Sequence, residues 1–143
     1  MERGDGVMTD EKKLQWGLFS LRVGIAFIFL TWTIDKIFNY SHNSTMLSKY
    51  YFVDISQPVL LAIGIAELVL ILLFLTGKFK NVTYALILIF HLVTTIASAK
   101  KLFPPYAIHQ LLYFGSIPML AACICLYLNR DADTLFTLKG SKD

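Results

Sequence analysis

The chain has 143 residues, of which 56% are hydrophobic, and its mean hydropathy is +0.60. Soluble domains are about 45–50% apolar, and a chain this short has too little polar sequence to cover so much apolar surface in water. The net charge is only +3, and no basic run is interleaved with aromatic residues. These features exclude a water-soluble globular domain and do not indicate a nucleic-acid partner.

Four apolar blocks follow one another along the chain, at about residues 16–38, 58–76, 82–99 and 108–128. Each holds about 18–23 residues, which as a helix spans a hydrocarbon core of about 30 Å. Helices satisfy their own backbone hydrogen bonds in lipid, and the blocks lack the alternation of barrel strands. The sequence therefore predicts an all-α, integral membrane four-helix bundle, with residues 1–143 forming a single membrane domain.

The connections between the blocks are short. Residues 77–81 join the second block to the third, which predicts a tight antiparallel hairpin. Pro104 and Pro105 separate the third block from the fourth, since proline ends one helix and readily starts the next. The longest connection, residues 39–57, is rich in tyrosine and is expected at the membrane interface, where a short helix would also fit.

The distribution of lysine and arginine predicts that both termini are cytoplasmic. Positive residues are concentrated in the cytoplasmic connections of membrane proteins. With the N-terminus inside, the outer connections carry only Lys49, Lys100 and Lys101. The inner segments then carry Arg3, Lys12, Lys13, Lys78, Lys80, Arg130, Lys139 and Lys142.

Ionisable residues inside the predicted spans are the candidates for a functional site. A charge at the bilayer centre costs about 2.5–3.5 kcal/mol on insertion scales, so each such residue is a functional candidate. Arg22 and Glu67 lie at similar predicted depths, so we expect them to form an ion pair, which either contributes to a site or only fixes helix register. Lys36 shares a helix face with Arg22, and snorkelling to the surface is its alternative. Together with His91, these residues predict a buried polar group that forms a quinone or proton site.

His91 lies near the middle of the third predicted span. A histidine there can carry protons, donate a hydrogen bond to a quinone-like carbonyl or ligate haem; a structural bond to a neighbouring helix is the alternative. His109, Tyr113 and Ser116 form a secondary polar stripe on the fourth span. His91 and His109 differ in height by about 9 Å, which argues against a shared haem. We therefore predict no metal site and no intrinsic cofactor.

The first two blocks resemble a known family. They read LRVGIAFIFLTWTIDKIF and LLAIGIAELVLILLFLTGKF, and within residues 21–79 the chain is similar to the DoxX-like family of small four-helix membrane proteins. The family's glycine before the lysine of the first span is replaced by Thr33. The resemblance implies quinone-linked oxidation of sulfur compounds, membrane-tethered oxidoreductase assemblies or receptor-assembly chaperoning, because one scaffold serves several functions. The matching positions are Arg22, Lys36, Glu67 and Gly77.

These observations predict a small integral subunit of a quinone-linked oxidoreductase or electron-transfer assembly, which anchors it and lines a quinone or proton site. Cys123 and Cys125 do not form a Cys-x-x-Cys motif, so the electron carrier is expected on a partner subunit, with quinone at an interface. The chain is expected to be a non-catalytic subunit in a bacterial or archaeal inner or cytoplasmic membrane, surrounded by lipid and other subunits. The alternatives are a non-enzymatic assembly factor and a small proton-coupled transporter that uses Glu67.

Overall fold

The computed structural model describes residues 8–104 and 110–138. The main helices are α1 (Asp10–Phe38), α2 (Tyr40–Tyr51), α3 (Gln57–Leu75), α4 (Lys80–Ala97) and α5 (Ser116–Leu128). Two short 3-10 helices, η1 (Ala99–Leu102) and η2 (Gln110–Gly115), lie between α4 and α5. Four segments are long and apolar enough to cross a membrane, namely α1, α3, α4 and η2 with α5. The predicted all-α membrane four-helix bundle is confirmed, and the orientation of its termini stays a prediction.

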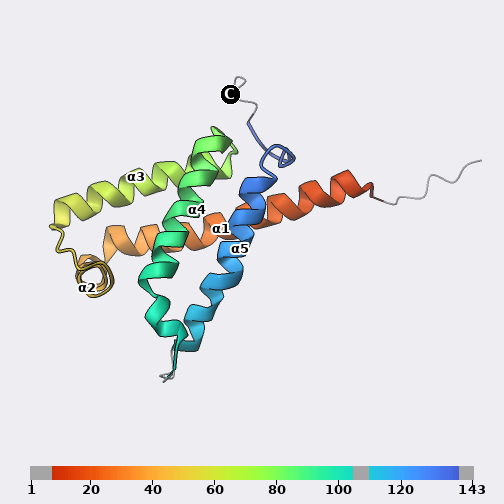
Figure 1. Cartoon of the computed structure of the whole chain (residues 1–143). Helices are drawn as coiled ribbons and strands as arrows, with labels where there is room; N and C mark the ends of the chain where they lie inside the picture. The colour runs from red at the N-terminus through yellow and green to blue at the C-terminus, as the bar shows by residue number, and fades with distance from the viewer. Residues whose placement is uncertain (1–7, 105–109, 139–143) are drawn as a thin grey trace, which may run out of the picture.

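The helices pack as two pairs. α1 lies mainly along α3 and α4 mainly along α5, and the second pair crosses α1 (Figure 1). A short turn joins α3 to α4 as predicted, but the two helices do not pack tightly along their length, because each packs mainly against another helix. A short connection fixes the ends of two helices and leaves their axes free. Here Gly77 (φ 65°) and Phe79 (φ 52°) both adopt left-handed backbone angles, which reverse the chain sharply before α4.

The close approach of α1 and α3 depends on a glycine. A Cβ on Gly64 of α3 would lie 2.8 Å from Cγ1 of Ile37 on α1, so only glycine fits without movement of the neighbour. The facing side of α1 is buried at positions three or four apart, as expected for one face of a helix. These buried residues are Leu18, Arg22, Ile25, Ala26, Phe29 and Thr33.

The core of the bundle is formed by large apolar side chains from all four spanning helices. It includes Ile25 of α1, Phe74 of α3, Ile87 of α4 and Leu126 of α5. The outer surface is apolar as well, with exposed side chains such as Ile65 and others along each span. Helices that are apolar on all sides are typical of a membrane environment, where lipid replaces water around the bundle.

Candidate functional site

The polar residues inside the bundle form three separate groups along α1. The first surrounds Arg22 near the turn between α3 and α4, which we call the turn end. The second surrounds His91, which packs against Phe29 and neighbouring side chains of α1. The third contains Lys36 and lies toward α2, at what we call the α2 end. The candidate residues from the sequence therefore do not make one cluster.

At the turn end, Arg22 is fully buried and pairs with Asp133. Its Nη1 lies 3.0 Å from Oδ2 of Asp133 and 3.3 Å from the hydroxyl of Tyr84. The Tyr84 hydroxyl in turn donates to the same carboxylate oxygen at 2.7 Å. Nη2 donates to the carbonyl of Leu135. Arg22 thus satisfies most of its donors within the protein, as a buried cation must.

Asp133 belongs to residues 129–138, which follow α5 and which we call the C-terminal segment. This segment folds back over the turn end, where Leu138 donates from its backbone nitrogen to the carbonyl of Thr76 at 2.9 Å. Lys80 Nζ donates to the carbonyls of Arg130 and Asp133, at 3.2 and 2.5 Å. The segment therefore closes the bundle and supplies the counter-ion that α1 needs.

The predicted Arg22–Glu67 ion pair is wrong. The two residues bind different partners, Asp133 at the turn end and Lys36 at the α2 end. The prediction placed Arg22 and Glu67 by depth alone and counted only partners within spans. It did not consider that the segment after α5 could return and bury a carboxylate.

At the α2 end, Lys36 of α1 binds Glu67 of α3. Lys36 Nζ lies 2.5 and 2.6 Å from the two carboxylate oxygens of Glu67, and the hydroxyl of Thr33 donates to one of them at 3.2 Å. Both charged side chains are 20% exposed, so this pair lies nearer the surface of the bundle than the Arg22 pair. Lys36 therefore neutralises an intramembrane carboxylate.

His91 of α4 is buried between α1 and α5. Its Nε2 lies 3.0 Å from the carbonyl of Ser116, and a carbonyl only accepts, so Nε2 is the donor; in the neutral imidazole Nδ1 then keeps a lone pair. Within the described part of the chain, Nδ1 has no hydrogen-bond partner, and neither does the buried Ser116 hydroxyl. The His91 ring stacks on Trp32 (6.2 Å between centroids), whose side chain is 42% exposed. A buried acceptor thus lies beneath an aromatic side chain that faces the surroundings.

The secondary stripe on the fourth span is only partly described. His109 lies outside the described residues. The Tyr113 hydroxyl pairs with that of Tyr50 on α2 at 3.0 Å, while Ser116 offers its carbonyl to His91. Tyr113 and Ser116 therefore contact different partners.

Sequence reasoning missed the roles of α2 and of Asp133. A dense set of hydrogen bonds surrounds the Asp35 carboxylate, which accepts from Asn39 at 3.0 Å and from Asn43 at 2.9 Å. These bonds hold the start of α2 against α1.

In residues 8–104 and 110–138, no three His, Cys, Asp or Glu side chains come together as a metal site would require.

A sequence model of the family described as methylamine utilisation protein MauE matches residues 14–105, more than half of the chain. The chain belongs to the MauE family. The resemblance to DoxX-like proteins was therefore wrong, because short motifs set in apolar sequence occur in more than one membrane family. No curated protein and no solved structure gives a significant match.

The MauE match ends before the C-terminal segment. It includes α1 from residue 14 onward and all of α2, α3 and α4, and with them Arg22, Lys36, Glu67 and His91. Asp133, the partner of Arg22, lies beyond it. Membership of the MauE family and the four candidate spans together identify an integral membrane protein, with lipid around its apolar exterior.

Proposed function

We propose that this MauE-family chain is a membrane-embedded accessory subunit of a quinone-linked redox assembly that uses methylamine or a related small amine. In this role it holds partner subunits at the membrane, and the partners carry the electrons. The family description, a methylamine utilisation protein, supports the class of substrate for the assembly. An assembly factor with the same architecture is the near alternative.

The pairing of the intramembrane charges supports this proposal. Arg22 is neutralised by Asp133, and Lys36 by Glu67, across different parts of the bundle. The Lys36–Glu67 pair joins α1 to α3 and the Arg22–Asp133 pair joins α1 to the C-terminal segment, so both hold α1 in place, which suits a rigid anchor. The first turn of α1 supplies a surface for partners, because the stretch from Asp10 to Lys13 is exposed and strongly polar.

Purification of the tagged chain from its own membranes in mild detergent tests the accessory role. We expect it to co-purify with further protein chains, at least one of which shows a flavin, haem or quinone-type absorption band. Isolation as a homo-oligomer without partners, under conditions that keep other membrane assemblies intact, would contradict the proposal. A variant with Glu11 and Lys12 reversed in charge should lose partners while the bundle stays folded, because both side chains are exposed.

His91 favours a second, finer role in which the chain lines a quinone site. The unpartnered Nδ1 of His91 accepts a hydrogen bond, so it suits a quinol hydroxyl better than a quinone carbonyl. The Ser116 hydroxyl lies in the same buried region and adds a second polar group. Trp32 covers the ring from the lipid side and would have to move to admit a planar ligand.

The two tryptophans of the chain make this role easy to test. In a Trp16→Phe variant, Trp32 is the sole tryptophan and lies against His91, so its fluorescence reports ligand at this site. We expect a short-chain quinol to quench it saturably, and His91→Leu to abolish the saturable part. Trp32→Phe, which leaves Trp16 as reporter, is the matched control for quenching through lipid or solution. Equal quenching in both single-tryptophan proteins would count against a quinone site here.

A further inference from the structure

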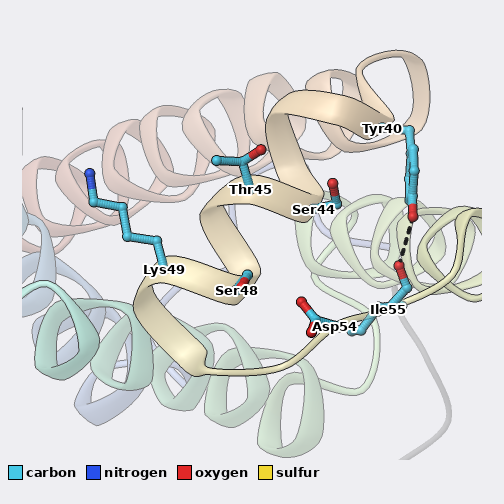
Figure 2. Close-up of a pocket in the computed structure, with 7 residues that line it drawn as sticks. All are labelled: Tyr40, Ser44, Thr45, Ser48, Lys49, Asp54 and Ile55. Atoms are coloured by element: carbon cyan, nitrogen blue, oxygen red, sulfur yellow. Dashed lines mark hydrogen bonds between the residues drawn. The ribbon is translucent and has the colours of Figure 1, made fainter.

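A groove lies between α2 and the chain that follows it (Figure 2). It is open on one side and has a volume of about 480 Å³. We call it the α2 groove. It is lined mainly by polar side chains, with hydroxyls on one wall and single charges of opposite sign. These are Tyr40, Ser44, Thr45, Ser48, Lys49 and Asp54.

The α2 groove is held in shape by the backbone and by one hydrogen bond. Phe52 ends α2 in the left-handed conformation (φ 57°), which turns the chain back toward the helix. The hydroxyl of Tyr40, at the start of α2, then donates to the carbonyl of Ile55 at 3.0 Å (Figure 2). Both ends of the groove are thus fixed before any ligand binds, which lowers the entropic cost of binding.

The groups in the α2 groove fit a ligand that carries both charges. Lys49 and Asp54 are exposed, and within the described residues neither forms an ion pair. Ser44 and Thr45 donate their hydroxyl protons to the carbonyl of Ser41, so their oxygens remain as acceptors. Acceptors beside a carboxylate suit an ammonium group, and the lysine suits a phosphate.

The position of the α2 groove identifies the source of such a ligand. α2 connects the ends of two spanning helices, α1 and α3, so it lies at the edge of the apolar belt. The flanking aromatic residues Phe38 and Phe52 are 83% and 85% exposed. Aromatic side chains at this level anchor a protein at the headgroup region of a bilayer. A headgroup in the groove would have its acyl chains beside these rings.

We propose that the α2 groove binds the headgroup of a phospholipid that bears a primary amine, of the phosphatidylethanolamine class. Its ammonium lies against Asp54 and the neighbouring hydroxyl oxygens, and its phosphate against Lys49, whose side chain would turn toward the groove from the outward position that Figure 2 shows. A primary ammonium donates hydrogen bonds, whereas a choline headgroup cannot, so the groove discriminates between two zwitterionic lipids. An anionic glycerol headgroup would meet the Asp54 carboxylate and is disfavoured. This site is independent of the proposed accessory function.

Native mass spectrometry of the delipidated full chain in detergent tests the site. The probes are phosphatidylethanolamine, phosphatidylcholine and phosphatidylglycerol with identical acyl chains. We expect the first to bind at least about threefold more tightly than the others, the size expected for one exposed charged contact. Asp54→Asn should remove the preference over phosphatidylcholine, and Lys49→Gln should weaken both zwitterionic lipids.

Matched controls come from the same chain. Asp131→Asn removes another exposed carboxylate, and Lys78→Gln removes a lysine that, like Lys49, lies over a neighbouring aromatic ring. Both should bind lipid as the unmodified chain does. An undiminished preference in Asp54→Asn, or tighter binding of phosphatidylglycerol, would overturn the proposal. Equally tight binding of soluble glycerophosphoethanolamine would also overturn it, because the groove would then hold a soluble zwitterion.

Discussion

Replacing Asp133 by asparagine should destabilise the protein strongly. The change leaves the guanidinium of Arg22 buried without its counter-ion, since Arg22 is 0% exposed and bonds Asp133 at 3.0 Å. Removing one partner of a buried pair typically costs about 3–5 kcal/mol. The carbonyl of Leu135 and the hydroxyl of Tyr84 still accept from Arg22. We therefore expect a loss of about 3 kcal/mol, at the lower end of that range.

A double change should recover much of this loss. Arg22→Met with Asp133→Leu removes both charges and leaves apolar groups of similar size, which is often neutral for a buried pair. Equilibrium unfolding in mixed detergent micelles measures the free energies of both variants. Circular dichroism at about 222 nm follows the loss of helix. The unmodified chain and the Tyr84→Phe variant serve as reference points for the free energy of unfolding. Tyr84→Phe should lose about 1–3 kcal/mol.

The same comparison of single and double variants, applied to Arg22 and Glu67, serves as the control. These residues bind different partners, so their effects should add to within about 0.5 kcal/mol. Two results would refute the reasoning on Asp133. One is a well-folded Asp133→Asn protein with unchanged stability. The other is an Arg22 and Asp133 double variant whose loss equals the sum of its single variants.

Three further changes follow from the packing of the bundle. Glu67→Gln should cost less than Asp133→Asn, because Lys36 is 20% exposed and its long side chain can turn toward the membrane edge when the carboxylate is lost; parallel unfolding curves decide the order. Gly77→Ala should lower the melting temperature, since the residue has φ 65° and its Cβ would meet the C-terminal segment at 2.6 Å. Gly64→Leu should separate α1 from α3, because even a Cβ there would lie 2.8 Å from Ile37. A disulfide probe across these helices should then form more slowly, whereas an unchanged rate would show that the contact is not tight.

The fold class could be predicted because lipid imposes it. Four long apolar blocks in a short chain leave helices as the way to satisfy the backbone, and the structure has four such helices. The start of α1 shows the limit of this reasoning. Hydropathy begins the first span at about residue 16, whereas the helix begins at Asp10, capped by the Thr9 side chain. The early turns are polar and helical, with Lys13 paired to Asp10 at 2.9 Å, so they extend the helix without extending the apolar span.

The candidate site could be predicted only in part. The free-energy cost of a charge inside the membrane indicated which side chains need partners. The structure gives Arg22, Lys36, Glu67 and His91 polar contacts. It could not identify the partners, because those depend on how helices cross and on where segments outside the spans return. A carboxylate just beyond the last span was a usable signal. Asp133 lies within reach of the membrane edge, where Arg22 also needs a counter-ion.

The separation of the three polar groups bears on function. Proton-coupled transport through a bundle needs titratable groups or water in a continuous path. Along α1, the buried apolar residues Ile25 and Ala26 lie between the Arg22 group and the His91 contact at Phe29. Glu67, the carboxylate that a transporter would use, is already bound by Lys36 through both of its oxygens. Isolated pairs joined by apolar layers favour a rigid membrane-embedded subunit, and they leave Nδ1 of His91, which has no partner among the described residues, as the place where a ligand would add chemistry.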